Sequence, residues 1–223
     1  CTGDAFVSMK AGVPCDMEDP DEALQPMTLF FWIYNADDKK IEEYLSRDPE
    51  NQYLPYHTLI EEARKRGGFP VNRNKIGLYH MVNEGEWRLN TTRIQGLSPV
   101  EEYDMSRAYV EGLKQVEFLM DFFKTLPGLE NARIAQSGAC VGIRESRKIK
   151  GIYTLTEQDL VECTRFEDAI ALCSYPVDLH PAKGALTGTS HKKEMTNVAE
   201  VYPIPYRILV PQNVDNLLVA GRC

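Results

Sequence analysis

The sequence predicts an α+β fold in which a mixed or antiparallel sheet packs against helices. Runs rich in β-branched and aromatic residues, typical of strands, occur beside segments with apolar residues at helical spacing. The two kinds of segment do not alternate strictly, which an α/β protein would require along its whole length. The 223 residues allow one large domain or two small ones with a sizeable core, and of these we expect one domain over residues 1–223. A fragment of an α/β protein is the alternative fold class.

The N-terminal part predicts a turn, a strand, two helices and a hairpin. Residues 1–8 are expected to form a tight turn that leads into a short helix. The run MTLFFWIY at 27–34 has the composition of a strand. Helices are expected over 36–49 and 56–68, the second of which is ended by two glycines. Residues 75–90 predict a β-hairpin closed by an Asn-Glu-Gly-Glu turn.

The strongest helical pattern covers residues 98–126. Ser98 is the expected N-cap, the proline after it suits the first helical position, and Glu101 would complete a capping box. The predicted apolar stripe consists of Tyr109, Leu113, Val116, Met120 and Phe123.

The C-terminal part is more irregular. Residues 132–155 predict two strands or one long bent strand, and a helix follows that is capped by Thr156. Residues 167–182 predict a short helix and then an extended piece bounded by prolines. Strands are expected over 201–210 and 216–222, with a turn between them.

Composition excludes several classes of function. The net charge is −8 with a pI near 5.1, whereas a nucleic-acid-binding protein needs a basic face. No run of eighteen apolar residues occurs, so we expect no membrane span. The six cysteines form no CxxC pair and are expected to be free thiols.

No metal site is predicted, since His57, His80 and His191 share no ligand spacing with a carboxylate or cysteine. The sequence also contains no GxSxG, no P-loop and no GxGxxG motif.

The segment GIRESRK at 142–148 is the first candidate for chemistry. An arginine at the end of an apolar strand, such as Arg144 or Arg147, can present a rigid pair of donors to a carboxylate or phosphate. The alternative is a solvated strand edge on which Glu145 pairs with a neighbouring base.

Two further segments are weaker candidates. Asp178 and His180, two residues apart between prolines, could orient each other for proton transfer, or His180 could be a structural hydrogen-bonding group. Tyr206 and Arg207 could bind an anion, or could simply lie at the edge of a sheet.

Five stretches taken in order resemble the FAD-dependent oxidoreductase family of bacteria, a branch of the glutathione-reductase-like flavoproteins. They are CTGDA at 1–5, LQPMTLFF at 24–31, GIRESRKIKGIYTLTEQDL at 142–160, YPVDLH at 175–180 and IPYRILVPQNVDNLLVAGRC at 204–223. The likeness runs along the whole chain, and its two longest motifs are specific.

The resemblance implies a position within a larger flavoprotein. In the family, a Rossmann unit with GxGxxG binds the dinucleotide, a CTGD-like turn closes that domain, and a late NLLVAGR strand returns to the flavin. We therefore expect a substrate-side domain whose residues 1–8 and 204–223 cross to an FAD-binding domain absent from this chain. The residues expected near FAD are Gly3, Asp4, Gly221 and Arg222.

The resemblance also implies roles for the candidate segments, on the face where a small organic substrate meets the flavin. Catalytic roles are expected for His180, Arg144 and Arg147. Substrate-binding roles are expected for Glu145, Tyr206 and Arg207. Hydride transfer between substrate and FAD is the expected activity of the whole enzyme, with the chain alone inactive and poor at binding FAD. The alternative is a non-catalytic binding or interaction module of the same fold. Substrate and localisation stay open.

Overall fold

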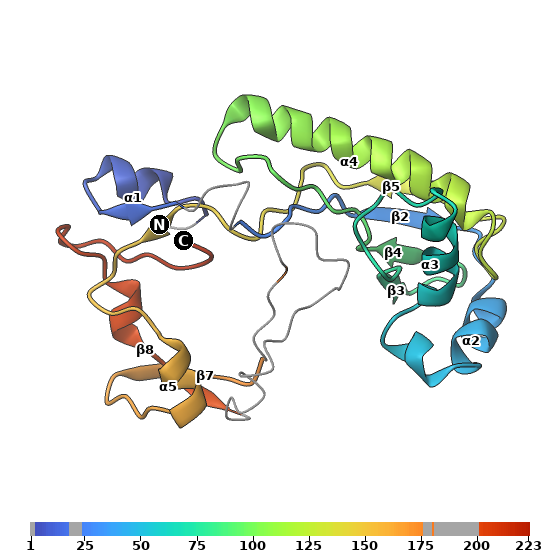
Figure 1. Ribbon diagram of the computed structural model, residues 1–223. Coiled ribbons are helices and arrows are strands. Elements are labelled where there is room, and N and C mark those ends of the chain that lie inside the picture. Colours follow the sequence, from blue (N-terminus) through green and yellow to red (C-terminus); the bar gives the residue numbers. More distant parts are fainter. Residues whose placement is uncertain (1–2, 18–23, 176–179, 181–200) are drawn as a thin grey trace. The chain divides into compact units, whose positions relative to one another are not determined.

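The computed structural model describes residues 3–17, 24–175, 180 and 201–223. These residues form two compact units, which we describe separately. The terminal unit comprises residues 1–25, 144–181 and 189–223, and the central unit comprises 26–143 and 182–188. Helices and antiparallel sheets occur in both units (Figure 1), which confirms the predicted α+β class. That the chain forms one substrate-side domain stays a prediction; the described residues cluster into two compact units.

A four-stranded antiparallel sheet forms the framework of the central unit. The strand order is β3–β4–β2–β5, with β2 at Phe31–Tyr34, β3 at Leu78–His80, β4 at Trp87–Leu89 and β5 at Arg133–Ser137. The hairpin of β3 and β4 confirms the prediction, and its turn places Gly85 at a φ of +75°. Left-handed backbone of this kind favours glycine, which explains the turn sequence.

Helices cover this sheet and complete the core (Figure 1). They are α2 at Asp38–Ser46, the 3₁₀ helix η1 at Pro49–Gln52, α3 at His57–Lys65 and the long α4 at Glu102–Phe123. The fully buried Phe31 of β2 stacks on Phe123 of α4, with ring centroids 6.2 Å apart. Both predicted helices before the hairpin are therefore confirmed, in shortened form.

The predicted start of α4 is wrong. Helix α4 begins at Glu102, with Glu101 as an N-cap whose side chain makes no capping bond. The Ser98 amide instead donates to Asp104 at 2.9 Å, and its hydroxyl accepts from the Val100 amide at 3.4 Å. The turn before the helix uses up the groups that a capping box would need.

The buried face of α4 is also rotated from the predicted stripe. Val116 and Phe123 are buried as expected, whereas Leu113 is exposed. Helix α4 comes close to the core at Gly112, which lies against Leu29 and Ile94 and leaves no room for a side chain. The full buried set is Ala108, Gly112, Val116, Leu119 and Phe123.

Carboxylate hydrogen bonds fasten the hairpin to α2. Asp38 accepts from Trp87 Nε1 at 2.7 Å, from the Gly85 amide at 2.8 Å and from His80 Nε2 at 3.0 Å. Partial burial acts to raise the pKa of Asp38, but the bonds from Gly85, His80 and Trp87 outweigh it and hold that pKa below its usual value. The carboxylate thus stays charged and keeps the hairpin in place.

The terminal unit is built from short elements. They are α1 at Phe6–Lys10, β1 at Cys15–Asp16, β6 at Lys148–Ile149, α5 at Glu157–Glu162, β7 at Ala169–Cys173, β8 at Tyr202–Pro205 and η3 at Tyr206–Leu209. β1 pairs with β6 and β7 pairs with β8, both antiparallel. The predicted cap of α5 is confirmed as a full capping box between Thr156 and Asp159.

Two predictions in this unit are wrong, and a third holds only in part, because the strand expected over 201–210 ends at Pro205 and is followed by η3. Residues 169–173 form a strand where a short helix was expected, because pairing with β8 outweighs the local pattern. Residues 216–222 form no strand, since Asn216 and Gly221 have positive φ angles that interrupt an extended backbone. Within that stretch Val219 is 3% exposed, whereas Leu218 is 48% exposed.

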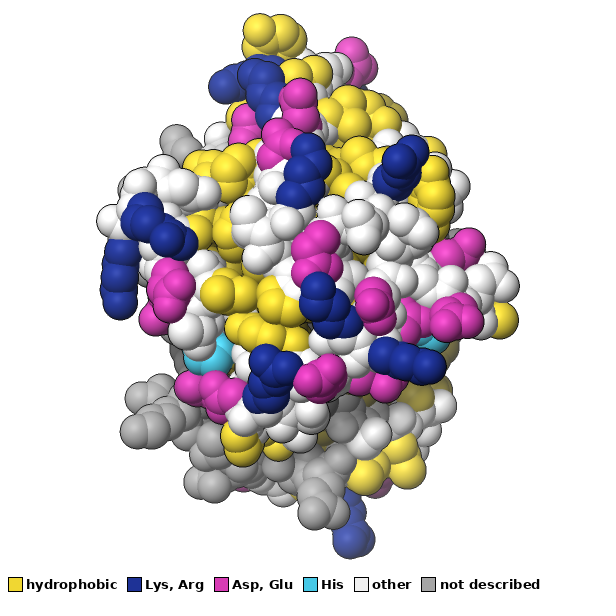
Figure 2. Space-filling model, turned by 90° about the vertical axis from the view of Figure 1, so that its right-hand side faces the viewer, with side chains coloured by type: hydrophobic (Ala, Val, Ile, Leu, Met, Phe, Trp, Pro, Cys, Tyr) yellow, Lys and Arg dark blue, Asp and Glu magenta, His cyan; other side chains and the backbone are white. Residues whose placement is uncertain are grey.

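The surface and thiols match the composition. Figure 2 shows a face on which basic and acidic side chains are interspersed rather than gathered by sign. Cys15, Cys140, Cys163, Cys173 and Cys223 are free. No helix in the described part of the chain is long and apolar enough to cross a membrane.

Replacing Gly112 by alanine tests the packing of α4. Alanine normally stabilises a helix relative to glycine, by about 1 kcal/mol. Here the added Cβ would lie 2.8 Å from Leu29 Cβ, so we expect a net destabilisation of about 1–3 kcal/mol. Chemical denaturation measures the difference. Ser106→Ala on the exposed side of α4 should change stability by less than about 0.5 kcal/mol. A stabilised Gly112→Ala protein would contradict the packing.

Candidate functional site

The segment 144–147 is the centre of the candidate site in the terminal unit. It follows the central unit directly and precedes β6. Three consecutive side chains, Glu145, Ser146 and Arg147, each contact a segment that is distant in sequence. These contacts account for the charged and polar residues that follow one another in the segment.

Glu145 binds the backbone and side chain of one residue. Its two carboxylate oxygens accept from the Gln25 amide at 3.0 Å and from Gln25 Nε2 at 2.8 Å. Gln25 Oε1 in turn accepts from the backbone amide of His180 at 2.9 Å. The amide of Gln25 therefore connects Glu145 to His180, two of the predicted site residues. Asp178, the expected partner of His180, lies outside the described residues.

Arg147 lies beside the N-terminal turn. Its Nη1 is 3.4 Å from both the carboxylate Oδ2 and the backbone oxygen of Asp4. The other carboxylate oxygen of Asp4 accepts at 3.1 Å from the amide of Phe6, the first residue of α1. Because these contacts are long and use one nitrogen, the Arg147 guanidinium keeps donor capacity for an anionic group.

Ser146 connects the same segment to the C-terminal turn. Its side chain is fully buried, and its hydroxyl accepts from Arg222 Nε at 3.3 Å. The backbone amide of Ile149 also donates to the Cys223 oxygen at 2.7 Å. Asp4 and Arg222 therefore contact adjacent residues of one segment, which brings the N-terminal and C-terminal turns close together.

A cavity of about 330 Å³ opens next to this cluster, between β6 and the C-terminal turn. This volume is at the lower end of the range for small-molecule sites. Lys148 and Gly221 line it together with mainly apolar side chains. Those side chains are Ile149, Tyr153, Leu155, Ile208, Leu209 and Val219.

The cavity has features that suit one part of a flavin. Its wall is apolar enough for a ring system, and Gly221, at a φ of +94°, exposes backbone at its edge. No Cβ at Gly3 would meet another atom within 4 Å, so the N-terminal turn is also open to close approach. The residues present thus fit a ligand that has a ring system and an anionic group close to the ring. The volume of the cavity is small for a whole dinucleotide.

Tyr206 and Arg207 lie in a second cluster of the terminal unit. Arg207 forms a forked ion pair with Asp168, with Nε and Nη2 at 2.6–3.0 Å from its oxygens. Its guanidinium also lies over the rings of Tyr153 and Phe166, each 5.9 Å from the centroid. Tyr206 is exposed, and its amide donates to the Asp168 backbone at 2.8 Å. Arg207 thus supports Tyr153, which lines the cavity, and its contact with substrate stays a prediction.

The predicted site residues therefore divide into two groups. The structure brings Glu145, Arg147, Asp4, Arg222 and the backbone of His180 together around one segment. Arg144 is half-buried at the start of that segment. Sequence reasoning missed Gln25 and Ser146, and no local signal identifies them, because their partners are 120 and 76 residues away.

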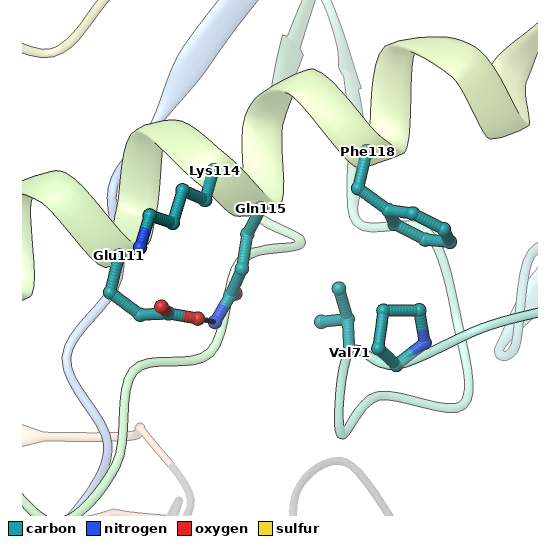
Figure 3. A pocket seen from close by; sticks show the side chains of 6 residues that line it. Val71, Glu111, Lys114, Gln115 and Phe118 are labelled. Carbon is teal, nitrogen blue, oxygen red and sulfur yellow. Dashed lines mark hydrogen bonds between the residues drawn. The ribbon is translucent and has the colours of Figure 1, made fainter.

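A smaller hollow in the central unit contains none of the predicted residues. It measures about 190 Å³ and lies between α4 and the loop at Pro70 and Val71. Figure 3 shows Phe118 facing Val71, while Glu111 and Gln115 point toward one another and form a hydrogen bond of 3.0 Å. Because its polar side chains bond to each other and its volume is small, this hollow is a poorer candidate for a ligand site.

The comparison with known families decides the wider identity. The family described as FAD dependent oxidoreductase matches residues 1–223, the full length of the chain. The chain belongs to this family. No match was found among the curated proteins or the solved structures. A flavin-dependent oxidoreductase role follows, with FAD as the family's cofactor, while the narrower glutathione-reductase-like branch stays a prediction.

The Asp168–Arg207 pair predicts a dependence of stability on pH. The hydrogen bond from Arg207 lowers the pKa of Asp168 to about 2, below its value of about 3.9 in an unfolded chain. The pair therefore stabilises the fold above about pH 4, and this contribution is lost as the pH falls through about 2.

Thermal unfolding of the wild type and Asp168→Asn across this range measures the effect. The wild type should have the higher Tm at pH 6, and the difference should shrink toward pH 2. A difference in Tm that is independent of pH would show that the charge of Asp168 is not what stabilises the fold.

Proposed function

We propose that this chain forms the substrate-side part of an FAD-dependent oxidoreductase that transfers a hydride between a small organic substrate and the flavin. The observation that carries the proposal is the convergence of Asp4, Arg147, Ser146 and Arg222 beside a mainly apolar cavity. The family resemblance assigns Asp4 and Arg222 to the flavin side and Arg147 to the face where substrate meets the flavin, whereas Ser146 is added by the structure. When bound, FAD supplies the hydride acceptor or donor.

The chain's own residues would bind the substrate and orient it toward the flavin. Arg147 is half-buried, and its charge would hold an anionic group, either a substrate carboxylate or the electron-rich edge of the flavin ring. Arg144 would hold a substrate carboxylate from the start of the same segment. His180 would hold or move a proton, with its backbone position fixed by Gln25. The apolar cavity wall would exclude water from the ring.

Binding of the dinucleotide itself would need another domain. The 223 residues contain no GxGxxG, the loop that brings the backbone and a helix N-terminus to the pyrophosphate. We therefore propose that an FAD-binding Rossmann domain of the same protein holds FAD against the terminal unit. The small organic substrate would contact the side chains of Arg144, Glu145 and Arg147.

Titrating the isolated chain with FAD tests whether binding of the dinucleotide needs a separate FAD-binding domain. We expect weak binding, because the site offers contacts for a ring system without a pyrophosphate loop. Quenching of flavin fluorescence reports the affinity, and riboflavin, which lacks the pyrophosphate, is the matched comparison. The two ligands should bind with similar weak affinity. Submicromolar binding of FAD with much weaker binding of riboflavin would show that no separate domain is needed.

Replacing Arg144 by alanine in the flavin-loaded enzyme tests its proposed role. Loss of a charged donor to a substrate carboxylate should lower kcat/KM for flavin reduction by at least about tenfold, mainly through KM. Stopped-flow absorbance of the flavin measures the rate. Arg133→Ala on the exposed β5 is the matched control and should leave it unchanged. Equal kinetics in Arg144→Ala and wild type would remove Arg144 from substrate binding.

A further inference from the structure

Three side chains with metal-binding chemistry meet in the central unit, in the connection between α2 and α3. Asp48, Glu50 and His57 place one ligand atom each so that all lie within 4.8 Å of one another. None of these residues belongs to the candidate flavin site. Their order, two carboxylates two residues apart and a histidine seven residues later, is not a recognised ligand spacing in sequence.

The two carboxylates are positioned by the 3₁₀ helix η1. Asp48 is its N-cap, and one of its oxygens accepts from the Glu50 amide at 2.9 Å. Pro49 follows at the first position of the turn and fixes the backbone angle φ there. The cap leaves the second oxygen of Asp48 for another partner, while Glu50 is 64% exposed and can adjust its side chain.

The imidazole of His57 is oriented by the backbone. Nδ1 lies 3.1 Å from the Leu54 carbonyl oxygen, which can only accept, so Nδ1 carries a proton. The side chain is 13% exposed, and Nε2 lies 3.2 Å from a carboxylate oxygen of Glu50. Histidines that bind metals commonly donate the other ring N–H to a backbone carbonyl in this way.

As they lie, the side chains of His57 and Glu50 are complementary to a positive charge between them. In the neutral imidazole, the Nε2 lone pair faces the Glu50 carboxylate, and two acceptors repel at 3.2 Å. The Thr58 hydroxyl, also 3.2 Å from Nε2, can donate to that nitrogen but does not supply charge to the carboxylates. Either a proton on Nε2 or a cation bound by all three side chains satisfies the group.

We propose that Asp48, Glu50 and His57 form a binding site for a divalent transition-metal ion such as Zn²⁺. One imidazole nitrogen and two carboxylate oxygens are ligands that Zn²⁺ accepts, and bonds of about 2.0–2.2 Å need only a small contraction of the cluster. Hard cations such as Mg²⁺ prefer oxygen ligands alone, so the histidine selects against them. The ion would tie η1 to the first turn of α3, with water in its open coordination positions.

Titration of the ¹⁵N-labelled chain with Zn²⁺ tests the proposal, with the histidine ring nitrogens followed by NMR. The first equivalent should shift the Nε2 signal of His57, and Mg²⁺ at the same concentration should not. His57→Ala and Glu50→Gln should each weaken Zn²⁺ binding at least tenfold. His80→Ala, which removes another described histidine, is the matched control and should bind as the wild type does.

Two results would overturn the site. Zn²⁺ binding of unchanged strength in both His57→Ala and Glu50→Gln would place the ion elsewhere, for example on cysteine thiols. A His57 signal that responds to pH but not to Zn²⁺ would show that a proton alone satisfies the pair. Glu50→Gln keeps the test independent of folding, since Glu50 is largely exposed and its backbone amide still donates to Asp48.

Discussion

The terminal unit depends on one short segment whose consecutive side chains reach in three directions. Glu145 binds Gln25, Ser146 accepts from Arg222, and Arg147 lies against Asp4. The elements of this unit are short, so secondary structure alone gives it little cohesion. Hydrogen bonds from partly buried charged groups fix the N-terminal turn and the C-terminal turn relative to each other, and the cavity beside them follows from that arrangement.

The contacts of this segment also involve side chains for which we propose a role toward substrate or flavin. Glu145, for example, binds Gln25 with both of its carboxylate oxygens. Arg147 keeps more of its donors than Arg207, whose fork is taken by Asp168. Arg147 is therefore better placed than Arg207 to meet an anionic ligand, although both looked alike in the sequence.

Several local features could be predicted from the sequence, whereas contacts between distant residues could not. The β3–β4 hairpin and the capping box of α5 follow from residues within a few positions of each other, and both are confirmed. The predicted start of α4 was wrong because the Ser98 amide donates to Asp104. The ion pair of Asp168 with Arg207 joins residues 39 apart, and the meeting of Asp48 with His57 depends on how η1 leads into α3, so neither had a recognisable spacing.

A structure of the flavin-loaded enzyme would test the central claim most directly, that segment 144–147 and the C-terminal turn face the flavin. In such a structure we expect contacts within about 4 Å between the isoalloxazine ring and residues of 144–147 or 219–223. We also expect that the bonds of Ser146 to Arg222 and of Glu145 to Gln25 persist. A flavin ring that contacts neither stretch would contradict the account.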